Sequence, residues 1–319
     1  MRHIGVLTSG GDAPGMNAAV RAVTRQALYH GLKVTGISRG YAGLIEGEFR
    51  ELYTRSVSDI IQRGGTILRT ARSEDFFREE GRAKAVLEIK REGIEGLVVI
   101  GGDGTFRGAS YLDAMGVPVV AIPATIDNDI PCTDNAIGFD TAVNTVVEAI
   151  NKIRDTATSH ERVFIIEVMG KHNGQIALMA GIAGGAESIL IPEVQYNLNV
   201  VAEKINRGYL HGKLHSIIVV AEGAGSALEI SNELKKRTEQ EIRVIILGHL
   251  QRGGSPTASD RTLASRMGAK AVDLLMEGSR GQMVNLCGQK VSSCGLNIVL
   301  SQKKSIDLDA YAMAEVLAI

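Results

Sequence analysis

Acidic side chains stand directly after two of the short apolar segments in this chain. Asp103 lies in the string GGDGT after Gly96–Ile100, and Asp127 and Asp129 lie in the string TIDND after Val119–Ile122. Glycines let a backbone approach phosphate groups closely, and one carboxylate beside them suits Mg²⁺. Of two carboxylates two residues apart, one can accept a proton from a hydroxyl while the other orients it or a metal. The strings predict nucleotide phosphates near a proton acceptor, with a helix cap and a solvated turn as the structural alternatives.

A second glycine-rich string, which includes Gly10 and Gly15, matches no phosphate-binding motif in full. Gly10 and Gly15 have the spacing of a P-loop, but Met16 and Asn17 occupy the positions of its Lys and its Ser or Thr. The spacing GxGxxG of dinucleotide-binding folds is absent as well. What is left is a glycine turn that opens a helix, whose free N–H groups and dipole favour an anion. The same turn also serves ordinary packing of a strand on a helix.

Short β-branched runs alternate with helical patterns along the chain. The helix expected near Thr141–Arg154 carries its apolar residues on one stripe, and another helix is expected near Met16–His30. Apolar strands that alternate with amphipathic helices indicate parallel sheets covered on both faces. In such sheets ligands bind outside the carboxyl ends of the strands. The expected strands include Ile4–Thr8, Gly96–Ile100, Val163–Val168, Ser216–Val220 and Val244–Leu247.

Composition limits the classes of partner and compartment. The 319 residues exceed what one core usually fills, so two domains are expected. A formal net charge of -1 gives no reason to expect a nucleic acid or an anionic membrane as partner. Cys132, Cys287 and Cys294 form no CxxC pair, so we expect no disulfide framework and a cytoplasmic location. The apolar start Ile4–Leu7 is too short for a signal peptide, and no apolar run is long enough to span a bilayer.

Seven blocks of sequence together resemble one enzyme family. From Ile4 to Met267 the chain is similar throughout to bacterial ATP-dependent 6-phosphofructokinases, and from about Gln282 the match is loose. The resemblance implies transfer of a phosphoryl group from Mg-ATP to the 1-hydroxyl of fructose 6-phosphate, which gives fructose 1,6-bisphosphate in glycolysis. The blocks are LTSGGDAPGMNAAVRAV, VVIGGDGT, PATIDNDI, DTATSHERVF, EVMGKHNG, AEG and GHLQRGGSPTASDR, in family order.

The resemblance also implies an architecture. The fold class is α/β, with two domains that are each a largely parallel sheet flanked by helices. Residues 1–137 plus about 251–301 would form the Mg-ATP-binding domain. Residues 138–250 plus about 302–319 would form the fructose 6-phosphate-binding domain. The family assembles as a homotetramer, so a homotetramer is expected here.

Site residues carry over position by position from the family. Asp127 would be the general base, while Arg72 and Thr125 would neutralise and position the transferred phosphoryl group. The residues expected around Mg-ATP are Gly11, Tyr41, Arg72, Gly102, Asp103, Gly104, Thr105 and Gly108, with Mg²⁺ at Asp103. Those expected around fructose 6-phosphate are Thr125, Asp127, Asp129, Met169, Gly170, Glu222, His249 and Arg252, with Arg162 and Arg243 reaching in from a neighbouring subunit.

Several of these residues have plain structural alternatives. Arg162 and Arg243 could be surface charges. His249 could be a core histidine, and Met169 could serve packing alone. Glu222 follows an apolar strand, where a buried charge would be costly without a ligand.

Two positions depart from the family pattern. Lys171 stands where relatives usually carry the Arg of EVMGR. By its position, Lys171 is among the residues that the resemblance expects to act in catalysis. An ammonium keeps the charge but lacks the planar fork that grips phosphate at two points. Thr54 takes the place of an arginine, which falls at Arg55 instead.

The second departure bears on an effector site for ADP or phosphoenolpyruvate that the resemblance implies. Arg21 and Arg25 lie four residues apart on the first helix and share a face. His211 stands where Lys or Arg is common, so the charge there depends on pH. The expected site comprises Arg21, Arg25, Arg154, Gly185, Glu187, His211, Lys213 and His215, with Glu187 and the Gly185 carbonyl holding a Mg²⁺.

Three other functions are weighed against this one. Pyrophosphate-dependent relatives usually carry Asp and Lys at the positions of Gly104 and Ala124, which are both small here and leave room for the α-phosphate of ATP. A non-catalytic sensor would not need Asp103, Asp127 and Asp129 together. A dinucleotide-dependent oxidoreductase would need the missing GxGxxG.

Overall fold

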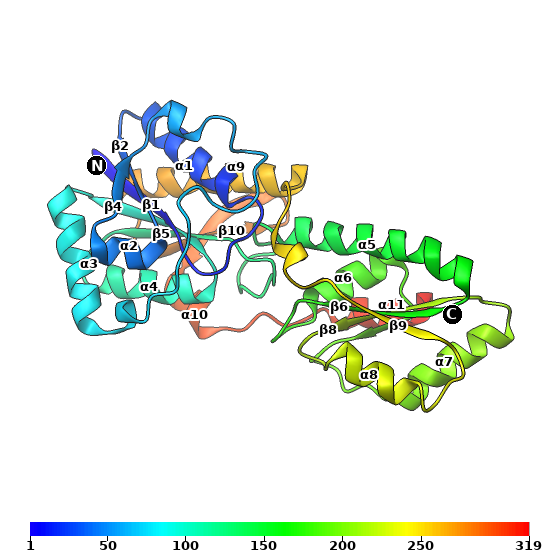
Figure 1. Ribbon diagram of the computed structural model, residues 1–319. Helices are drawn as coiled ribbons and strands as arrows, with labels where there is room; N and C mark the ends of the chain where they lie inside the picture. Colours follow the sequence, from blue (N-terminus) through cyan, green and yellow to red (C-terminus); the bar gives the residue numbers. More distant parts are fainter. Residues whose placement is uncertain (319) are drawn as a thin grey trace. The chain divides into compact units, whose positions relative to one another are not determined.

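The computed structural model describes residues 1–318, which form two compact units (Figure 1). Unit 1 comprises Met1–Thr141 and Arg252–Lys304, and unit 2 comprises Ala142–Gln251 and the residues from Ser305 onward. In each unit a mostly parallel sheet is covered by helices, which confirms the α/β fold class predicted from the sequence. No helix among residues 1–318 has the length and apolar character needed to cross a membrane.

Unit 1 is built on a sheet whose described strands number seven, in the order β11-β10-β5-β4-β1-β2-β3. The inner strands are parallel, and β3 and β11 pair antiparallel at the two edges. Inner strands such as β1 and β4 are buried along their whole length. The strands are β1 (His3–Thr8), β2 (Lys33–Ile37), β3 (Phe49–Glu51), β4 (Gly96–Gly101), β5 (Val119–Pro123), β10 (Gln282–Cys287) and β11 (Lys290–Gly295).

The helices of unit 1 cover this sheet. Gly268 lets two of them, α1 and α9, approach closely, because a Cβ at that position would lie 2.6 Å from the Cβ of Ala22. The helices are α1 (Met16–Tyr29), α2 (Gly40–Glu46), α3 (Glu79–Glu92), α4 (Asp103–Ala114), α9 (Ala258–Met276) and α10 (Leu296–Ser301), with short 3₁₀ helices at Thr54–Val57 and Asp75–Phe77. A third 3₁₀ helix, Gly248–Arg252, spans the boundary between the two units in the sequence.

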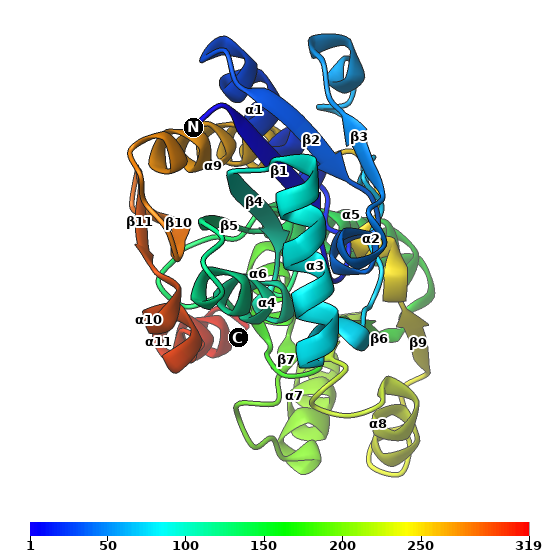
Figure 2. The same ribbon diagram turned by 90° about the vertical axis from the view of Figure 1, so that its left-hand side faces the viewer.

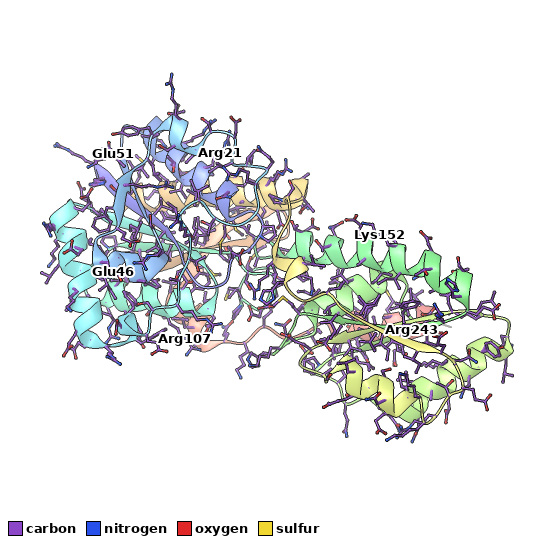
Figure 3. All side chains as sticks on the ribbon, viewed as in Figure 1. Arg21, Glu46, Glu51, Arg107, Lys152 and Arg243 are labelled. Atoms are coloured by element: carbon purple, nitrogen blue, oxygen red, sulfur yellow. The ribbon has the colours of Figure 1, made fainter. Side chains whose placement is uncertain are left out.

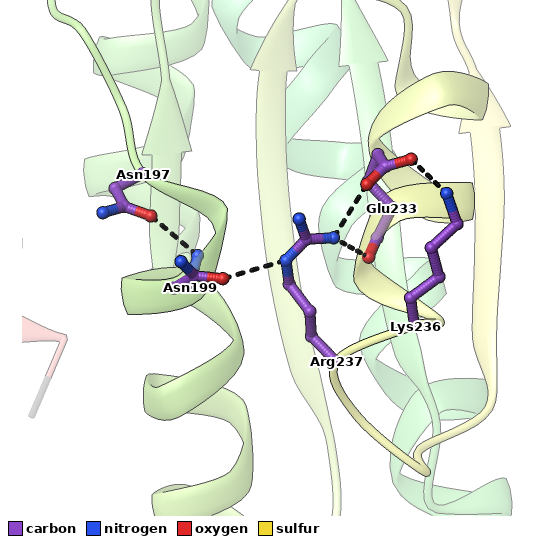
Figure 4. Close-up of polar contacts among 5 residues, drawn as sticks. All are labelled: Asn197, Asn199, Glu233, Lys236 and Arg237. Atoms are coloured by element: carbon purple, nitrogen blue, oxygen red, sulfur yellow. Dashed lines mark hydrogen bonds and ion pairs between the residues drawn. The ribbon is translucent and has the colours of Figure 1, made fainter.

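Unit 2 holds a smaller sheet, β7-β8-β6-β9, in which all described pairs are parallel. Figure 4 shows how two of its helices are tied together: Arg237, after α8, donates to the Asn199 side chain of α7 at 2.9 Å. Asn197 caps α7 by accepting from the backbone N–H of Asn199 at 2.9 Å. The strands are β6 (Val163–Val168), β7 (Ser188–Leu190), β8 (Ser216–Ala221) and β9 (Ile242–Ile246), and the helices are α6 (Gln175–Gly184), α7 (Leu198–Leu210), α8 (Ala227–Leu234) and α11 (Leu308–Leu317).

Helix α5 (Phe139–His160) runs longer at both ends than the span expected near Thr141–Arg154. Its start is fixed by Asp260, whose carboxylate accepts from the backbone N–H groups of Gly138 and Thr141, both at 2.8 Å. Asp260 lies on α9, far away in sequence, so the local pattern of apolar residues gives no sign of this cap.

Candidate active site

The carboxyl ends of three neighbouring strands, β5, β4 and β1, meet at one edge of the unit 1 sheet. Hydrogen bonds join the loops that leave these strands: the N–H of Ser9 donates to Ile100 O at 3.0 Å, and the N–H of Ala124 donates to Gly101 O at 2.9 Å. The Thr105 hydroxyl donates to Ser9 O at 3.0 Å. The glycine-rich strings after β1 and β4 and the TIDND string after β5 are thereby brought to one place, as expected for a parallel sheet.

A cavity of about 410 Å³ opens at this edge. Its volume lies in the range of sites for small molecules. The expected residues that line it are Gly11, Tyr41, Arg72, Gly102, Asp103, Gly104, Thr105, Thr125, Asp127, Asp129 and Arg252.

Glycines give this cavity its backbone-lined floor. A Cβ placed on Gly101 would lie 2.4 Å from Ser9 O, so only glycine allows this close approach of two loops. Gly104 is different, because a Cβ there meets no atom within 4 Å. Open space therefore lies beside the N-terminus of α4, whose free N–H groups favour an anion. Ala124, the other small residue that bears on the choice of phosphoryl donor, lines the same cavity.

Asp103 begins helix α4 at the wall of the cavity. Its carboxylate is half exposed and accepts from Arg107 Nε, one turn further along the helix, at 2.9 Å (Figure 3 labels Arg107). No group of three or more His, Cys, Asp or Glu side chains among residues 1–318 is arranged to hold a metal ion alone. Mg²⁺ normally takes one or two protein carboxylates and completes its shell with phosphate and water oxygens. One carboxylate on a phosphate-sized cavity fits that mode.

In the TIDND loop, a buried residue with a structural task lies between two residues that line the cavity. Asn128 is buried, and its side chain donates to Asp134 O at 3.1 Å and accepts from the N–H of Ala136 at 2.9 Å. It holds a left-handed backbone angle, φ 51°, which Asn tolerates better than most residues. Asp127 and Asp129, on either side of it, both line the cavity.

The electrostatics of the cavity are those of a carboxylate cluster. The pKa of Asp129 is raised, first because neighbouring atoms limit hydration of its carboxyl group, and next because Asp127 and Asp103 repel its negative charge. Lys304 acts in the opposite direction. Three interacting carboxylates on one wall make the cavity attractive to a divalent cation.

Two phenylalanines in an aromatic wall of the cavity were missed from the sequence, although Tyr41 beside them was expected. The ring of Tyr41 stacks on that of Phe76 with centroids 4.0 Å apart, and Phe77 follows at the cavity mouth. The Tyr41 hydroxyl donates to Thr105 O at 2.6 Å, and burial raises its pKa. The only available signal was the Phe-Phe pair soon after Arg72 in a chain that is poor in aromatics. Other lining residues that were missed are Ser9, Gly10, Ala71, Ser73 and Glu74.

Gly108 differs in position from the other residues expected around ATP. It does not line the cavity, since it is buried behind Tyr41. A Cβ at Gly108 would lie 2.4 Å from the Tyr41 ring. The absence of a side chain at Gly108 therefore leaves room for the Tyr41 ring, which forms part of the aromatic wall.

The carboxyl ends of adjacent strands carry the expected substrate residues of unit 2. Met169 and Gly170 follow β6, Glu222 follows β8 and His249 follows β9. The N–H of Glu222 donates to Val168 O at 2.9 Å, which holds two of these loops together. Lys171, the departure from EVMGR, is exposed in the same loop as Met169.

One structural alternative at this edge is wrong, and so is one argument for a ligand. His249 is exposed, so it is not a core histidine. Glu222 is also exposed, so the argument that its charge would be buried and would need a ligand does not hold. Both side chains are instead open to a ligand at the carboxyl end of the sheet.

Arg162 and Arg243 lie at the other edge of the unit 2 sheet. Arg162 precedes β6, and Arg243 is the second residue of β9, opposite Phe164 in the register. Glu241 pairs with both, accepting from Arg162 Nε at 2.7 Å and forming an ion pair with Arg243 (labelled in Figure 3). Within unit 2 the two arginines are therefore not brought together with Glu222 and His249.

Most of the expected effector residues gather in unit 2. Arg154 on α5 donates to Gly185 O at 3.2 Å and to Gly184 O. Lys213 Nζ lies 2.8 Å from Glu187 Oε1. The two oxygens to which the resemblance assigns Mg²⁺ therefore contact cationic side chains here.

Histidines flank this cluster. The pKa of His215 is lowered by burial and by the charges of Arg154 and Lys213, although Glu187 opposes the shift, so the ring is neutral at pH 7. His211 is exposed at the end of α7.

Arg21 and Arg25 belong to α1 of unit 1 (Arg21 is labelled in Figure 3). The pKa of Arg21 is lowered by burial and by the charge of Arg25, so the two guanidinium groups sense each other as a shared helix face requires. Thr54 and Arg55 form the start of the 3₁₀ helix Thr54–Val57 in the same unit.

Comparison with known proteins places the chain in a family. A family model named Phosphofructokinase matches residues 3–275. The ATP-dependent 6-phosphofructokinase of Halothermothrix orenii is 57% identical over 331 residues, and that of Bacillus subtilis is 56% identical over 319 residues, each covering 100% of both chains. The crystal structure of Pichia pastoris phosphofructokinase in the T-state superposes with a TM-score of 0.90 at 34% identity, over 99% of this chain and 37% of that chain. The chain belongs to the phosphofructokinase family.

Proposed function

We propose that this protein is an ATP-dependent 6-phosphofructokinase, which phosphorylates fructose 6-phosphate to fructose 1,6-bisphosphate in glycolysis. The observation that carries the proposal is the cavity of unit 1, where Asp103, Asp127 and Asp129 face a glycine-lined floor. Full-length relatives at 57% identity carry this activity by name. The reaction is a phosphoryl transfer to an alcohol, which depends on alignment and neutralisation of charge.

Each group at the cavity has a distinct duty in this proposal. Asp127 accepts the proton of the attacking hydroxyl, and Thr125 and Arg72 position and neutralise the transferred phosphoryl group. Asp103 holds the Mg²⁺ of Mg-ATP, which screens the phosphate charges when bound. Tyr41 and the phenylalanines beside it offer apolar surface next to the phosphate floor, as a nucleoside requires.

The choice of ATP as the donor rests on space. The opening beside Gly104 and the small Ala124 leave room for the α-phosphate and the nucleoside. In a pyrophosphate-dependent enzyme that room is taken by larger charged residues, so we do not favour this alternative.

The residues proposed to recognise fructose 6-phosphate are Met169, Gly170, Glu222, His249 and Arg252. Arg162 and Arg243, at the amino edge of the unit 2 sheet, are proposed to bind the sugar phosphate of a neighbouring subunit. This arrangement requires an oligomer, and we propose the homotetramer of the family in the cytoplasm.

We further propose that Arg21, Arg25, Arg154 and Lys213 bind ADP or phosphoenolpyruvate. The support is the gathering of Arg154, Gly185, Glu187, Lys213 and His215 in unit 2. The lowered pKa of His215 leaves the positive charge to the lysine and the arginines, so effector binding should be salt-sensitive.

A donor comparison tests the proposed function. Purified protein is given fructose 6-phosphate and Mg²⁺ with either ATP or pyrophosphate, and fructose 1,6-bisphosphate is measured directly by chromatography. We expect product with ATP only, and we expect Gly104→Asp to weaken ATP use by filling the open space. Ala114→Asp, which adds the same charge at the exposed far end of the same helix, is the matched control. Product from pyrophosphate alone, or unchanged ATP kinetics in Gly104→Asp, would contradict the donor assignment.

A further inference from the structure

All three cysteines of the chain converge on one place in unit 1, although Cys132 lies far from the others in sequence. Cys287 ends β10 and Cys294 lies on β11, so both belong to the antiparallel hairpin at the edge of the sheet (Figure 2). Cys132 lies in the loop that follows the TIDND string. The Cys294 and Cys132 thiols influence each other's protonation, and Cys132 Sγ donates to Gln302 Oε1 at 3.7 Å. Cys287 Sγ lies 3.9 Å from Cys132 O.

The hairpin register explains this convergence independently. Met283 pairs with Cys294, and Asn285 pairs with Ser292. Cross-strand partners and residues two apart share one face of a sheet, so Cys294 and Cys287 project from the same face as Asn285. The Asn285 side chain donates to Cys132 O at 2.7 Å, which places Cys132 over that face.

The surroundings of the sulfurs suit oxidation and not metal binding. No metal-ligating group of three or more His, Cys, Asp or Glu side chains occurs within residues 1–318. Cys132 and Cys294 are partly buried against the apolar core, while Cys287 is exposed. Burial and the neighbouring sulfurs raise the pKa of Cys294 to about 12, so its thiol keeps its proton at neutral pH. Cys294 therefore suits the role of the thiol that reacts second.

We propose that Cys132 and Cys294 form a reversible disulfide when the protein meets hydrogen peroxide. The Cys132 thiol first releases its proton, and the thiolate attacks one peroxide oxygen. The O–O bond breaks, a sulfenic acid forms, and the departing hydroxide takes up the released proton to become water. The Cys294 thiol then attacks the sulfenic sulfur, so that the S–S bond forms, the S–O bond breaks and the hydroxide leaves as water with the Cys294 proton. The two sulfurs lose two electrons, and one peroxide becomes two waters.

The disulfide would tie the catalytic loop to β11. Cys132 lies three residues beyond Asp129, and the next residues are already bound to β10: the N–H of Asp134 donates to Leu286 O at 2.9 Å, and the N–H of Leu286 donates to the Thr133 hydroxyl at 3.0 Å. A new covalent bond at Cys132 must shift this anchored segment, because bonded sulfurs stand only about 2 Å apart. The effect on turnover rests on the proposed role of Asp127 in the same loop, whereas the disulfide itself does not.

Trypsin separates the three cysteines, which makes the bond easy to map. Cleavage after Lys and Arg leaves Cys132 in residues 108–152, Cys287 in residues 281–290 and Cys294 in residues 291–303. The reduced protein is treated with a small excess of hydrogen peroxide, alkylated, digested without reductant and analysed by mass spectrometry. We expect a linked peptide pair that contains Cys132 and Cys294. The pair should be lost in Cys132→Ser and Cys294→Ser and kept in Cys287→Ser, the matched control. A Cys132–Cys287 pair, or three cysteines that are only alkylated or overoxidised, would overturn the proposal.

The second arm measures turnover of the same samples. We expect oxidation to lower kcat/KM by about tenfold or more, since misplacement of reacting groups by about 1 Å can cost about 100-fold. Dithiothreitol should restore activity in the wild type and in Cys287→Ser, and Cys132→Ser should be insensitive to peroxide. If the mapped disulfide forms while the oxidised protein keeps full activity, the link from the thiol pair to the active loop is wrong. The proposed function would still stand, because it is measured on the reduced protein.

Discussion

Asn128 shows how one residue can position two neighbours that differ from it by a single chemical group. Its buried amide satisfies a carbonyl and an N–H of the same loop, a task for which both a donor and an acceptor are required. An ionised Asp at this position could only accept. The carboxylates of Asp127 and Asp129 are thereby reserved for the cavity, and their nearness to each other contributes to the raised pKa of Asp129.

At this scale we predict the effect of Asp127→Asn. The amide cannot take a proton from the sugar hydroxyl, so kcat should fall by about 10²–10⁴. Binding of Mg-ATP should change little, because the phosphate floor and Asp103 are untouched. Isothermal titration with a non-hydrolysable ATP analogue and a steady-state assay measure the two effects. Glu74→Gln is the control, since Glu74 lines the same cavity without an assigned role. Turnover within a few-fold of wild type in Asp127→Asn would remove the base assignment.

At the scale of the element, Lys304 provides one further anchor for the loop between β5 and α5. Lys304 Nζ donates to Thr133 O and Asp134 O, each at 2.8 Å. Desolvation lowers the pKa of Lys304 to about 8, while Asp134 and Asp129 oppose the shift. Below this value Lys304 is an ammonium group that anchors the loop and offsets the charge of Asp129, and above it the charge is lost.

The pH profile of kcat/KM tests this anchor. In the wild type kcat/KM should fall as the pH rises through about 8, the value for Lys304. Lys304→Arg keeps its charge and should lose this decline, whereas Lys304→Met should be impaired at every pH. The stability contribution of Lys304 moves the other way, because the folded protein binds fewer protons than the unfolded chain between about 8 and the ordinary value of 10.5. A denaturation series at the same pH values therefore separates the effect from unfolding. A decline that persists in Lys304→Arg would assign it to another group.

The whole molecule is expected to work only as an assembly. Arg162 and Arg243 lie at the amino edge of the unit 2 sheet, while Glu222 and His249 lie at its carboxyl edge. Residues at the amino ends of the strands cannot converge with residues at the carboxyl ends of the same sheet on one small sugar phosphate. The arginines are therefore proposed to serve the site of another subunit.

Mixed oligomers test this proposal. Arg243→Ser chains and Asp127→Asn chains are each expected to be nearly inactive alone. After unfolding and refolding together, hybrids should regain part of the activity, since some interfaces then combine one intact set of residues. Mixing each variant with itself is the control. If well-mixed hybrids show no recovery, the site is not shared between subunits.

Across the molecule, local patterns in the sequence predicted what depends on near neighbours. The strand at Val163–Val168 was predicted with its observed bounds, because a β-branched run between helices has few alternatives. The family blocks led to most of the residues that line the unit 1 cavity. What escaped prediction depends on distant partners: Asp260 caps α5 across 119 residues, and Phe76 joins the cavity wall only because Tyr41 stacks on it. The open position of Glu222 was missed for the same reason, since a strand end does not reveal whether another segment covers it.

The discontinuity of unit 1 has a consequence for synthesis on the ribosome. β5 pairs with β10, yet the whole segment 142–251 of unit 2 is made between them. A nascent chain that has emerged as far as β5 therefore carries a bare, apolar strand edge until residues 282–287 follow. Such an edge invites pairing with another chain. We expect nascent chains that stall between these points to be the species most dependent on chaperones. Unit 1 cannot fold as a finished body before its second segment, Arg252–Lys304, has been translated.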